Sequence, residues 1–380
     1  MKKNVVIIFG GKTTEHDISI ITAEQIMKGY TKEEFNILPI FITKSNEWLL
    51  SKKIGNSKFY KTAEKHMNDF TKVFLVCGSS CLYKKTFKGL SKYLEIHAII
   101  NACHGGDGEN GNLTALVKMC NIPCSSGSTC AMSMFMDKAI TKIFAKGLKI
   151  PVLSYSVFNI LDYQKNKIAI LEKLSALKTP LIVKPARQGS SIGIELAKNE
   201  VELENAINVA FQYDTKIIVE KGLTNFREFN VAVFGHADGD DENIIVSEID
   251  EPTRSDEILT FSDKYMHNGK LKGKGMSGIA RKTPTDIPAN VLEEIKTASL
   301  KLFKMSGLKG VVRMDYLYDN DSKKWYFNET NTIPGSLGYY FYGEKRITRT
   351  ALLEKLVFDA EFDFALENSL SCDYITDVIK

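Results

Sequence analysis

Short apolar runs alternate with helix-like stretches through the first 130 residues of the chain. The β-branched run from Asn4 to Phe9 ends at Gly10-Gly11, and helical periodicity follows over residues 19–29. A strand, a glycine turn and a helix in succession form the repeating unit of a parallel sheet. Further strands are predicted over residues 35–42, 72–77 and 98–103. The pattern therefore predicts an α/β domain with glycines at strand ends, where open parallel sheets bind ligands.

The pattern changes after residue 130 and predicts two further domains. One helix is predicted over residues 130–148, and strands are predicted over 181–184 and 216–220. More strands follow, with a long helix from Ala289 to Met305 and a helical end over 348–380. Boundaries near 137 and 224 give domains of residues 1–137, 138–224 and 225–380. The Gly- and Lys-rich stretch 264–284 predicts either a mobile loop over a site or an ordinary surface loop.

Composition agrees with several domains and excludes some classes of partner. A chain of 380 residues exceeds the usual size of one hydrophobic core. The 50 basic and 46 acidic side chains nearly cancel, so the charge gives no reason to expect a nucleic acid or a membrane as partner. The chain has no run of 18 apolar residues, and its seven cysteines form no CxxC pair. We therefore expect a cytoplasmic protein with reduced thiols.

Two segments in the middle of the chain are candidates for nucleotide binding. Gly10-Gly11 is not followed by the spacing of a dinucleotide-binding turn, and no P-loop sequence occurs. The segment KPARQGSSIGI, residues 184–194, offers a lysine, two hydroxyl groups and glycine N–H groups to an anion, although a surface turn would have the same sequence. In the second segment, Glu220 and Lys221 end a predicted strand and Glu228 follows, so these groups could contact an adenine or a ribose.

A predicted pair of strands near the end of the chain carries candidate metal ligands. In VVRMDYLYD, residues 311–319, alternation places Arg313 and Asp315 on one face. In WYFNETN, residues 325–331, alternation places Phe327, Glu329 and Asn331 on one face. If the strands pair, the carboxylates of Asp315 and Glu329 converge with Asn331 beside Arg313. Mg²⁺ prefers one or two carboxylates together with phosphate and water oxygens, so this cluster predicts a magnesium site.

Taken in order, these segments resemble the ATP-grasp ligases and, among them, the D-alanine:D-alanine ligase family. The resemblance runs from residue 5 to about 335. It rests on GGKTTEHDIS, HGGDGENG, SGSTCAMSMFMDKAITK, KPARQGSSIG, VEK with REF, DKY, RMD and NETNTIPG. Each motif alone is weak, but eight in the family's order and spacing are specific. The resemblance implies a three-domain ATP-grasp architecture, with an N-terminal parallel-sheet domain followed by two α+β domains.

The resemblance also implies a role for individual residues. It implies ATP binding by Lys138, Lys184, Ser191, Glu220, Lys221, Leu223, Glu228 and Lys264, and binding of two Mg²⁺ ions, with Mn²⁺ as an alternative, by Asp315, Glu329 and Asn331. Glu15 would bind the ammonium group of the first substrate, and Ser190 and Tyr265 would close the loop over it. Arg313 and the N–H of Gly335 would face the acyl oxygen, and His104 would lie at the substrate.

The implied reaction joins two amino acids at the expense of ATP. A carboxylate is a poor electrophile, so it is first phosphorylated to an acylphosphate, and an amine then attacks it. The likeness to the family favours D-alanine as the first substrate and a dipeptide for peptidoglycan precursors as the product. The sequence leaves open a ligase that acts outside peptidoglycan synthesis and a non-catalytic ATP-binding regulator. A homodimer is common in the family, but no residue here indicates one.

The chain departs from the family's pattern after Pro334-Gly335. The family has small hydroxyl residues here, one of them a serine that holds the carboxylate of the second substrate. In this chain the segment is SLGYYFYG, and the position of the serine falls at Tyr340, with Tyr339 and Phe341 beside it. Two smaller departures are Asn110, where the family has an aspartate, and Thr114-Ala115, where the family has a Gln-Gly pair. Either a tyrosine hydroxyl replaces the serine and the product is D-alanyl-D-alanine, or the second substrate has changed.

Overall fold

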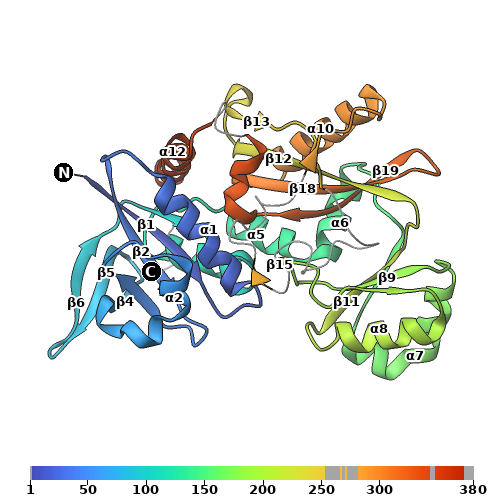
Figure 1. The fold of residues 1–380 in the computed structure, drawn as a ribbon, viewed down its shortest axis with the longest axis horizontal. Helices are drawn as coiled ribbons and strands as arrows, with labels where there is room; N and C mark the ends of the chain where they lie inside the picture. The colour runs from blue at the N-terminus through green and yellow to red at the C-terminus, as the bar shows by residue number, and fades with distance from the viewer. Residues whose placement is uncertain (1, 253–265, 268–269, 272–280, 343–346, 372–380) are drawn as a thin grey trace, which may run out of the picture.

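Three lobes make up the computed structural model, which describes residues 2–252, 266–267, 270–271, 281–342 and 347–371 (Figure 1). The N-terminal lobe is blue and cyan in Figure 1, and the central lobe, in green, lies across from it. The third lobe, in yellow to red, lies above both and contains the long strands of the C-terminal half. Segments 264–265, 268–269 and 272–280 of the predicted loop lie outside the described residues.

The N-terminal lobe is built on a seven-stranded mixed sheet in the order β6-β5-β4-β3-β2-β1-β7. Strand β1 (Lys3–Gly10) pairs in parallel with β2 (Phe35–Ile42) and β7 (Ala98–Asn101). The other strands, β3 (Trp48–Ser51), β4 (Phe70–Val76), β5 (Ser79–Thr86) and β6 (Gly89–Glu95), extend the sheet by antiparallel pairing. The strands predicted at 4–9 and 35–42 are thus confirmed, whereas the strand predicted at 72–77 is antiparallel to its neighbours.

Helices of the N-terminal lobe connect these strands. Helix α1 (His16–Gly29) follows β1 after the Gly10-Gly11 turn, and α2 (Ser57–Lys61) and the 3-10 helix η1 (Ala63–Asp69) follow β3. Helices α3 (Gly106–Glu109) and α4 (Asn112–Met119) follow β7. Gly10 has a φ of 92°, and a side chain there would collide with the carbonyl of Ile42, so the turn requires glycine.

The predicted helix over 130–148 is two helices, α5 (Thr129–Met136) and α6 (Lys138–Gly147). Asp137 between them has an extended backbone, and its carboxylate accepts hydrogen bonds from the N–H groups of Ala139 and Ile140 at 3.0 and 3.1 Å. An aspartate at this position caps the new helix by satisfying its first N–H groups. The break places Lys138 at the start of α6 instead of within a continuous helix.

The central lobe contains a four-stranded antiparallel sheet in the order β10-β9-β11-β8. The strands are β8 (Tyr155–Asn159), β9 (Leu181–Pro185), β10 (Glu195–Ala197) and β11 (Lys216–Lys221). Helices α7 (Ile160–Ser175) and α8 (Glu200–Ala210) pack on one face of this sheet, as Figure 1 shows. The strands predicted at 181–184 and 216–220 are confirmed.

The C-terminal lobe contains the antiparallel sheet β13-β12-β18-β19. Its strands are β12 (Phe226–His236), β13 (Ile245–Val246), β18 (Lys309–Asp319) and β19 (Lys324–Asn331), with α10 (Ala289–Lys304) packed on it. The remaining elements are η2 (Asp241–Asn243), η4 (Gly335–Phe341), α12 (Arg349–Asn368) and two pairs of two-residue strands, β14 (Glu251–Pro252) with β17 (Arg281–Lys282) and β15 (Met266–His267) with β16 (Lys270–Leu271).

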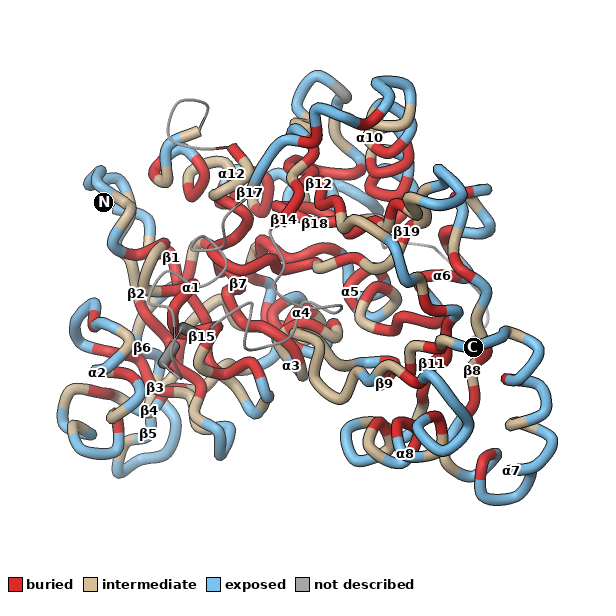
Figure 2. Tube along the Cα trace, turned by 45° about the vertical axis from the view of Figure 1, so that its right-hand side comes forward, coloured by how far each residue is buried: buried red, intermediate tan, exposed pale blue. Residues whose placement is uncertain are grey.

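The apolar core does not stop at the lobe boundaries. Buried residues of β1, among them Val5 and Ile7, share one cluster with Leu352, Leu353 and Leu356 of α12. Figure 2 shows the buried residues running in one band from β1, through α1 and β7, to β12 and β18. The last helix of the chain therefore joins the C-terminal lobe to the N-terminal one. The division into three domains at 137 and 224 stays a prediction.

Candidate functional site

A β-bulge between β18 and β19 sets which side chains face the site. Asp315 lies opposite Glu329, but the next pair is Tyr316 with Phe327, so Asn328 is an extra residue on β19. The prediction that Phe327 shares a face with Glu329 is therefore wrong. Phe327 packs on Tyr316 in the core, with ring centroids 5.6 Å apart, while Glu329 lies on the site face. A bulge reverses the alternation of a strand, and it is common beside active sites.

The predicted cluster of polar groups on these strands is present. Arg313 donates from Nε and Nη2 to the two oxygens of Asp315, each at 2.7 Å. The amides of Asn331 and Asn230 donate to the same carboxylate at 3.1 and 2.9 Å. Burial alone would lower the pKa of the Arg313 guanidinium, but Asp315 and Tyr340 together outweigh burial and hold that pKa well above its usual value. Arg313 and Asp315 thus form a fixed, buried ion pair.

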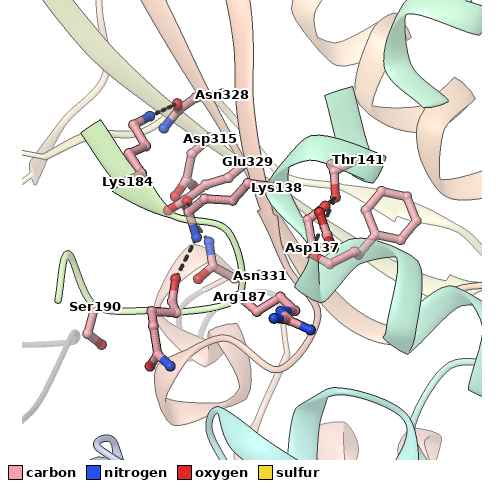
Figure 3. Close-up of polar contacts among 12 residues, drawn as sticks. Asp137, Lys138, Thr141, Lys184, Arg187, Ser190, Asp315, Asn328, Glu329 and Asn331 are labelled. Carbon is pink, nitrogen blue, oxygen red and sulfur yellow. Dashed lines mark hydrogen bonds and ion pairs between the residues drawn. The ribbon is translucent and has the colours of Figure 1, made fainter. Parts of the chain in front are cut away.

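Two lysines of the central lobe, Lys138 and Lys184, contact strand β19 beside this cluster. The Nζ of Lys138 lies 3.2 Å from Glu329 and donates to the backbone oxygen of Gln188 at 2.6 Å. Lys184, at the end of β9, donates to the side-chain oxygen of Asn328 at 3.0 Å. Figure 3 shows both lysines directed toward β19, with Ser190 on the neighbouring loop. Loop 186–194 and β19 are therefore linked through Lys138.

The donor set of this cluster suits Mg²⁺. Among the residues that the structure describes, no three His, Cys, Asp or Glu side chains come together as a metal site. Two carboxylates, Asp315 and Glu329, and the carboxamide of Asn331 are present, and each carboxylate has a cationic neighbour. Mg²⁺ usually takes one or two carboxylates and completes its shell with phosphate and water oxygens. The residues fit a metal that is bound together with a phosphate group.

A cavity of about 310 Å³ lies between the central sheet and β18. Lys184, Glu220, Lys221 and Leu223 line it, together with Leu153, Thr179, Pro180, Ile182, Leu196, Lys198, Thr224, Phe226 and Leu317. Its lining combines apolar side chains with four charged ones, Lys184, Lys198, Glu220 and Lys221, which suits an aromatic base with a polar extension. Of the other residues predicted to bind ATP, Lys138, Ser191 and Glu228 do not line this cavity, and Lys264 lies outside the described residues.

A second, smaller cavity of about 40 Å³ brings the N-terminal lobe to the cluster. It is lined by Glu15, His104, Glu109, Phe135, Met136, Lys138, Gln188, Gly189, Ser190, Arg313, Glu329, Thr330, Asn331, Ile333 and Gly335. Glu15 accepts a hydrogen bond from the Ser190 hydroxyl. Burial lowers the pKa of His104 to about 4, and its Nε2 lies 2.8 Å from the Thr22 hydroxyl, so the ring is neutral at pH 7.

The aromatic segment after Gly335 divides between the site and the core. The Tyr340 hydroxyl lies 3.5 Å from Nη1 of Arg313, and the Phe341 ring lies 4.6 Å from the Tyr340 ring. Tyr339 points away from this cavity and stacks under Arg349, with 4.6 Å from the guanidinium to the ring centroid. The structure therefore places Tyr340, and not Tyr339, beside the group predicted to face the acyl oxygen. Tyr265 lies outside the described residues.

Sequence reasoning missed two residues that hold the site together. Glu109 is buried, and its carboxylate accepts from the Thr332 hydroxyl at 3.1 Å, from the N–H of Ile333 at 3.2 Å and from the N–H of Gly105 at 2.8 Å. Lys142 is buried beside Glu220 at 3.0 Å. The sequence held one signal for Lys142, because it follows Lys138 by one helical turn and so lies on the same helix face.

Two antiparallel sheets with a cavity between them, and a mixed-sheet lobe that completes the site, define the ATP-grasp fold. The solved VanG D-Ala:D-Ser ligase from Enterococcus faecalis matches with a TM-score of 0.76 and 27% identity, over 95% of this chain and 100% of that one. The D-alanine-D-alanine ligase from Coxiella burnetii has the same fold, with a TM-score of 0.77 and 22% identity, over 97% of this chain and 96% of that one.

Sequence comparison gives the family. Residues 4–127 match the model for the D-ala D-ala ligase N-terminus, and residues 144–357 match the model for the C-terminus. The D-alanine--D-alanine ligase of Thermosipho africanus is 33% identical over 354 residues, which cover 93% of this chain and 92% of the relative. The enzyme of Staphylococcus epidermidis is 33% identical, over 90% of this chain and 89% of the relative. The chain belongs to the D-alanine–D-alanine ligase family, and the resemblance inferred from its motifs is confirmed.

Membership of this family makes the chain an enzyme of the ligase class that acts on small molecules and uses ATP with a divalent metal. Among the described residues, no helix combines the length and the apolar character needed to cross a membrane.

Proposed function

We propose that this chain is a ligase that uses ATP and Mg²⁺ to join D-alanine to a second D-amino acid, as D-alanyl-D-alanine or a D-alanyl-D-X variant for peptidoglycan precursors. One observation carries the proposal. Arg313, Glu329 and Asn331 line the smaller cavity together with Glu15, and Asp315 is bonded to Arg313. Lys184, which lines the 310 Å³ cavity, bonds Asn328 of the strand that carries Glu329 and Asn331, so the two cavities meet at this strand. Phosphoryl transfer between a nucleotide and a carboxylate requires such cationic and acidic groups where the two ligands meet.

The nucleotide half of the site supplies charge compensation. An adenine in the larger cavity would lie beside Glu220 and Leu223, and its phosphates would extend toward Lys184 and Lys138. Asp315, Glu329 and Asn331 would hold two Mg²⁺ ions, which would neutralise phosphate charge during transfer. Close approach of a triphosphate and a carboxylate requires this excess of positive charge, because the two anions repel each other.

The acyl half of the site stabilises a second step. Glu15, held by Ser190, would bind the ammonium of the first amino acid and direct its carboxylate toward the γ-phosphate. In the resulting acylphosphate, the amine of the second substrate forms a bond to the acyl carbon, and phosphate leaves with the bonding electrons. Arg313 and the N–H of Gly335 would stabilise the oxyanion formed in between, each by about 3–4 kcal/mol.

The position of the Tyr340 side chain favours a changed second substrate. Its ring replaces a small hydroxyl residue of the family and lies against Phe341, while its hydroxyl reaches Arg313. A hydroxyl carried by a ring is displaced from the backbone compared with one on a serine, so the space for the second substrate changes in shape. D-alanyl-D-alanine and a mixed D-alanyl product are both allowed by this arrangement.

Product identification tests this proposal directly. The purified chain is incubated with ATP, Mg²⁺ and D-alanine, alone and with each member of a panel of D- and L-amino acids and D-hydroxy acids, and products are identified by mass spectrometry. If D-alanyl-D-alanine is the main product, the change to Tyr340 does not alter the second substrate. A mixed product assigns the new specificity to that segment. No product and no phosphate release in any pairing would contradict the proposal and favour an ATP-binding regulator.

The metal assignment is tested by Glu329→Gln, which keeps the shape of the side chain and removes its charge. We expect turnover to fall by at least about a hundredfold, because the carboxylate is the ligand that Mg²⁺ prefers. Phosphate release measured over a range of Mg²⁺ concentrations gives the effect, and raising Mg²⁺ above the concentration that saturates the unaltered chain should restore part of the lost turnover. Unchanged turnover would remove Glu329 from the metal site.

Cytoplasmic location and homodimerisation also belong to this proposal. Of the described cysteines, Cys103, Cys120 and Cys124 are buried, and none of those described forms a disulfide, which fits a reducing compartment. Sedimentation of the purified chain would measure its oligomeric state.

A further inference from the structure

Four residues from four elements form a closed ring beneath the nucleotide cavity. Lys142 of α6 lies 3.0 Å from Oε1 of Glu220 on β11, and Lys184 of β9 donates to Oε2 of the same carboxylate at 2.8 Å. Lys184 also donates to the side-chain oxygen of Asn328, whose backbone oxygen accepts from Lys142 at 3.1 Å. The ring thus includes Asn328, the extra residue of the bulge in β19.

Two of the four residues are almost completely enclosed. The side chains of Lys142 and Glu220 are each 1% exposed, whereas Lys184 is 9% exposed and lines the nucleotide cavity. Lys142 does not line that cavity or the smaller one. It is therefore a buried cation for which the proposed reaction gives no role, and burying an ammonium group is costly unless a partner compensates it.

The charges around Glu220 show that one of its two lysines is not needed to neutralise it. Burial alone would raise the pKa of Glu220, but Lys142 and Lys184 outweigh burial and hold that pKa below its usual value. Among the described residues, Tyr155 on β8 and Lys138 on α6 also interact electrostatically with Glu220, and Glu329 acts on Lys142. One lysine would neutralise Glu220, so the ring carries one positive charge more than the carboxylate needs.

We propose that Lys142 is a positioning residue, the permanent counter-ion of Glu220, which lets Lys184 leave that carboxylate for the nucleotide phosphates. This inference depends on the proposed function, because it assigns Lys184 to the phosphates. Without Lys142, the departure of Lys184 would leave a buried carboxylate with no cation. The enclosed lysine therefore keeps Glu220 ionised and in place at the adenine while the mobile one changes partners.

The proposal predicts how many protons the protein takes up when ATP binds. In Lys142→Met, a long apolar side chain replaces the lysine, and Glu220 keeps Lys184 as its only close cation until ATP binds. When the phosphates take Lys184, the pKa of the buried carboxylate rises, and Glu220 takes up a proton. ATP binding by the variant should thus consume up to one proton more than binding by the unaltered chain, and its affinity should increase as the pH falls.

Calorimetry measures that count without requiring turnover. ATP with Mg²⁺ is titrated into the protein without amino acids, in two buffers of different ionisation enthalpy, between pH 6 and pH 8. For Lys142→Met we expect the Kd for ATP to rise about tenfold to a hundredfold at pH 8, and to return toward the unaltered value at pH 6. Comparison at one pH cancels the protons that belong to ATP itself.

Lys309 offers a matched control. It is a buried lysine paired with an acid, Asp363, in the contact between β18 and α12, and it lines neither cavity. Lys309→Met should lower the melting temperature but leave the proton count and its pH dependence unchanged. An equal change in both variants would mean that any buried lysine produces the effect, which would contradict the proposal.

The remaining outcomes separate this inference from the proposed function. Lack of ATP binding by the unaltered chain would contradict both. Normal ATP binding together with an unchanged proton count in Lys142→Met would overturn the inference alone. If Lys142→Met does not fold, Lys142→Met/Glu220→Gln replaces it. A folded double variant with pH-independent ATP binding supports the counter-ion role, and a double variant that still fails to fold identifies Lys142 as a packing residue.

Discussion

Single residues in this site depend on partners that only the fold brings close. The residue pattern of two strands is sufficient to predict that Asp315, Glu329 and Asn331 converge beside Arg313. It is insufficient to predict the bulge at Asn328, because an extra residue is defined only by the register with β18. The sequence does not distinguish Lys142 from other lysines on an amphipathic helix. Only the structure shows that it is buried against Glu220.

Arg313 is the residue for which the structure makes the sharpest prediction. Its guanidinium bonds both oxygens of Asp315 with two parallel hydrogen bonds and reaches Tyr340 with Nη1. Arg313→Lys keeps the charge but loses this planar geometry. We expect kcat to fall by about a hundredfold to a thousandfold, with little change in the Kd for ATP, because Arg313 lines the smaller cavity only.

Steady-state release of ADP measures kcat for Arg313→Lys, and calorimetry measures its affinity for ATP. An unchanged kcat would remove the guanidinium from oxyanion stabilisation. An equal loss of ATP affinity would instead indicate that the substitution disturbs the whole site.

At the scale of elements, strongly apolar segments were predictable and polar ones were not. Strand β2 has the predicted bounds, 35–42, because its sequence, FNILPIFI, is apolar at every position except Asn36. The hairpin of β5 and β6 escaped prediction, since β6 is mostly exposed and its sequence, GLSKYLE, has no apolar run. The helix predicted over 130–148 breaks because Asp137 caps a new helix, which apolar periodicity alone does not reveal.

Helix α12 is held to the sheet by a charged cluster that gives a pH prediction. Asp363 accepts from Lys309 of β18 and lies 2.9 Å from Nε2 of His236 on β12. Burial would raise the pKa of Asp363, but His236 and Lys309 outweigh it and lower the pKa to about 2. A lowered pKa stabilises the folded chain above the pKa of the unfolded aspartate, and this stabilisation is lost as the pH falls toward 2.

Asp363→Asn should therefore lower the free energy of unfolding by about 2 kcal/mol at pH 7. The difference from the unaltered chain should shrink between pH 5 and pH 2, and urea denaturation at several pH values measures it. Glu361→Gln on the same helix is the control, since its pair with Lys3 is exposed and should contribute less than about 1 kcal/mol. A constant difference across this pH range would contradict the assignment.

At the scale of the whole molecule, the site exists only where three lobes meet. Glu15 comes from the N-terminal lobe, Ser190 from the central lobe and Arg313 from the C-terminal lobe, and all three line one cavity of about 40 Å³. Motif order in the sequence was sufficient to predict this meeting through the family resemblance. Periodicity alone was not, because contacts between distant segments leave no periodic signal.

The contact of Ser190 with Glu15 connects the central lobe to the N-terminal lobe. Ser190→Ala removes a hydrogen bond to a carboxylate, which is worth about 1.5–3 kcal/mol. We expect the KM for the first amino acid to rise by about tenfold to a hundredfold, with the KM for ATP little changed. Initial rates at varied D-alanine and varied ATP measure the two constants. Equal increases in both would contradict a role at the amino acid alone.

The bulge at Asn328 has a consequence for how this family can diversify. Upstream of Pro334, β19 is fixed in phase by its pairing with β18, whereas downstream the Tyr340 segment packs beside α1 and α12. The residues that would use ATP thus belong largely to paired strands, whereas those that would contact the acceptor belong to the segment 335–342, and the two sets meet where Tyr340 reaches Arg313. Substitutions confined to residues 335–342 can therefore change the product while the residues that would bind ATP stay the same.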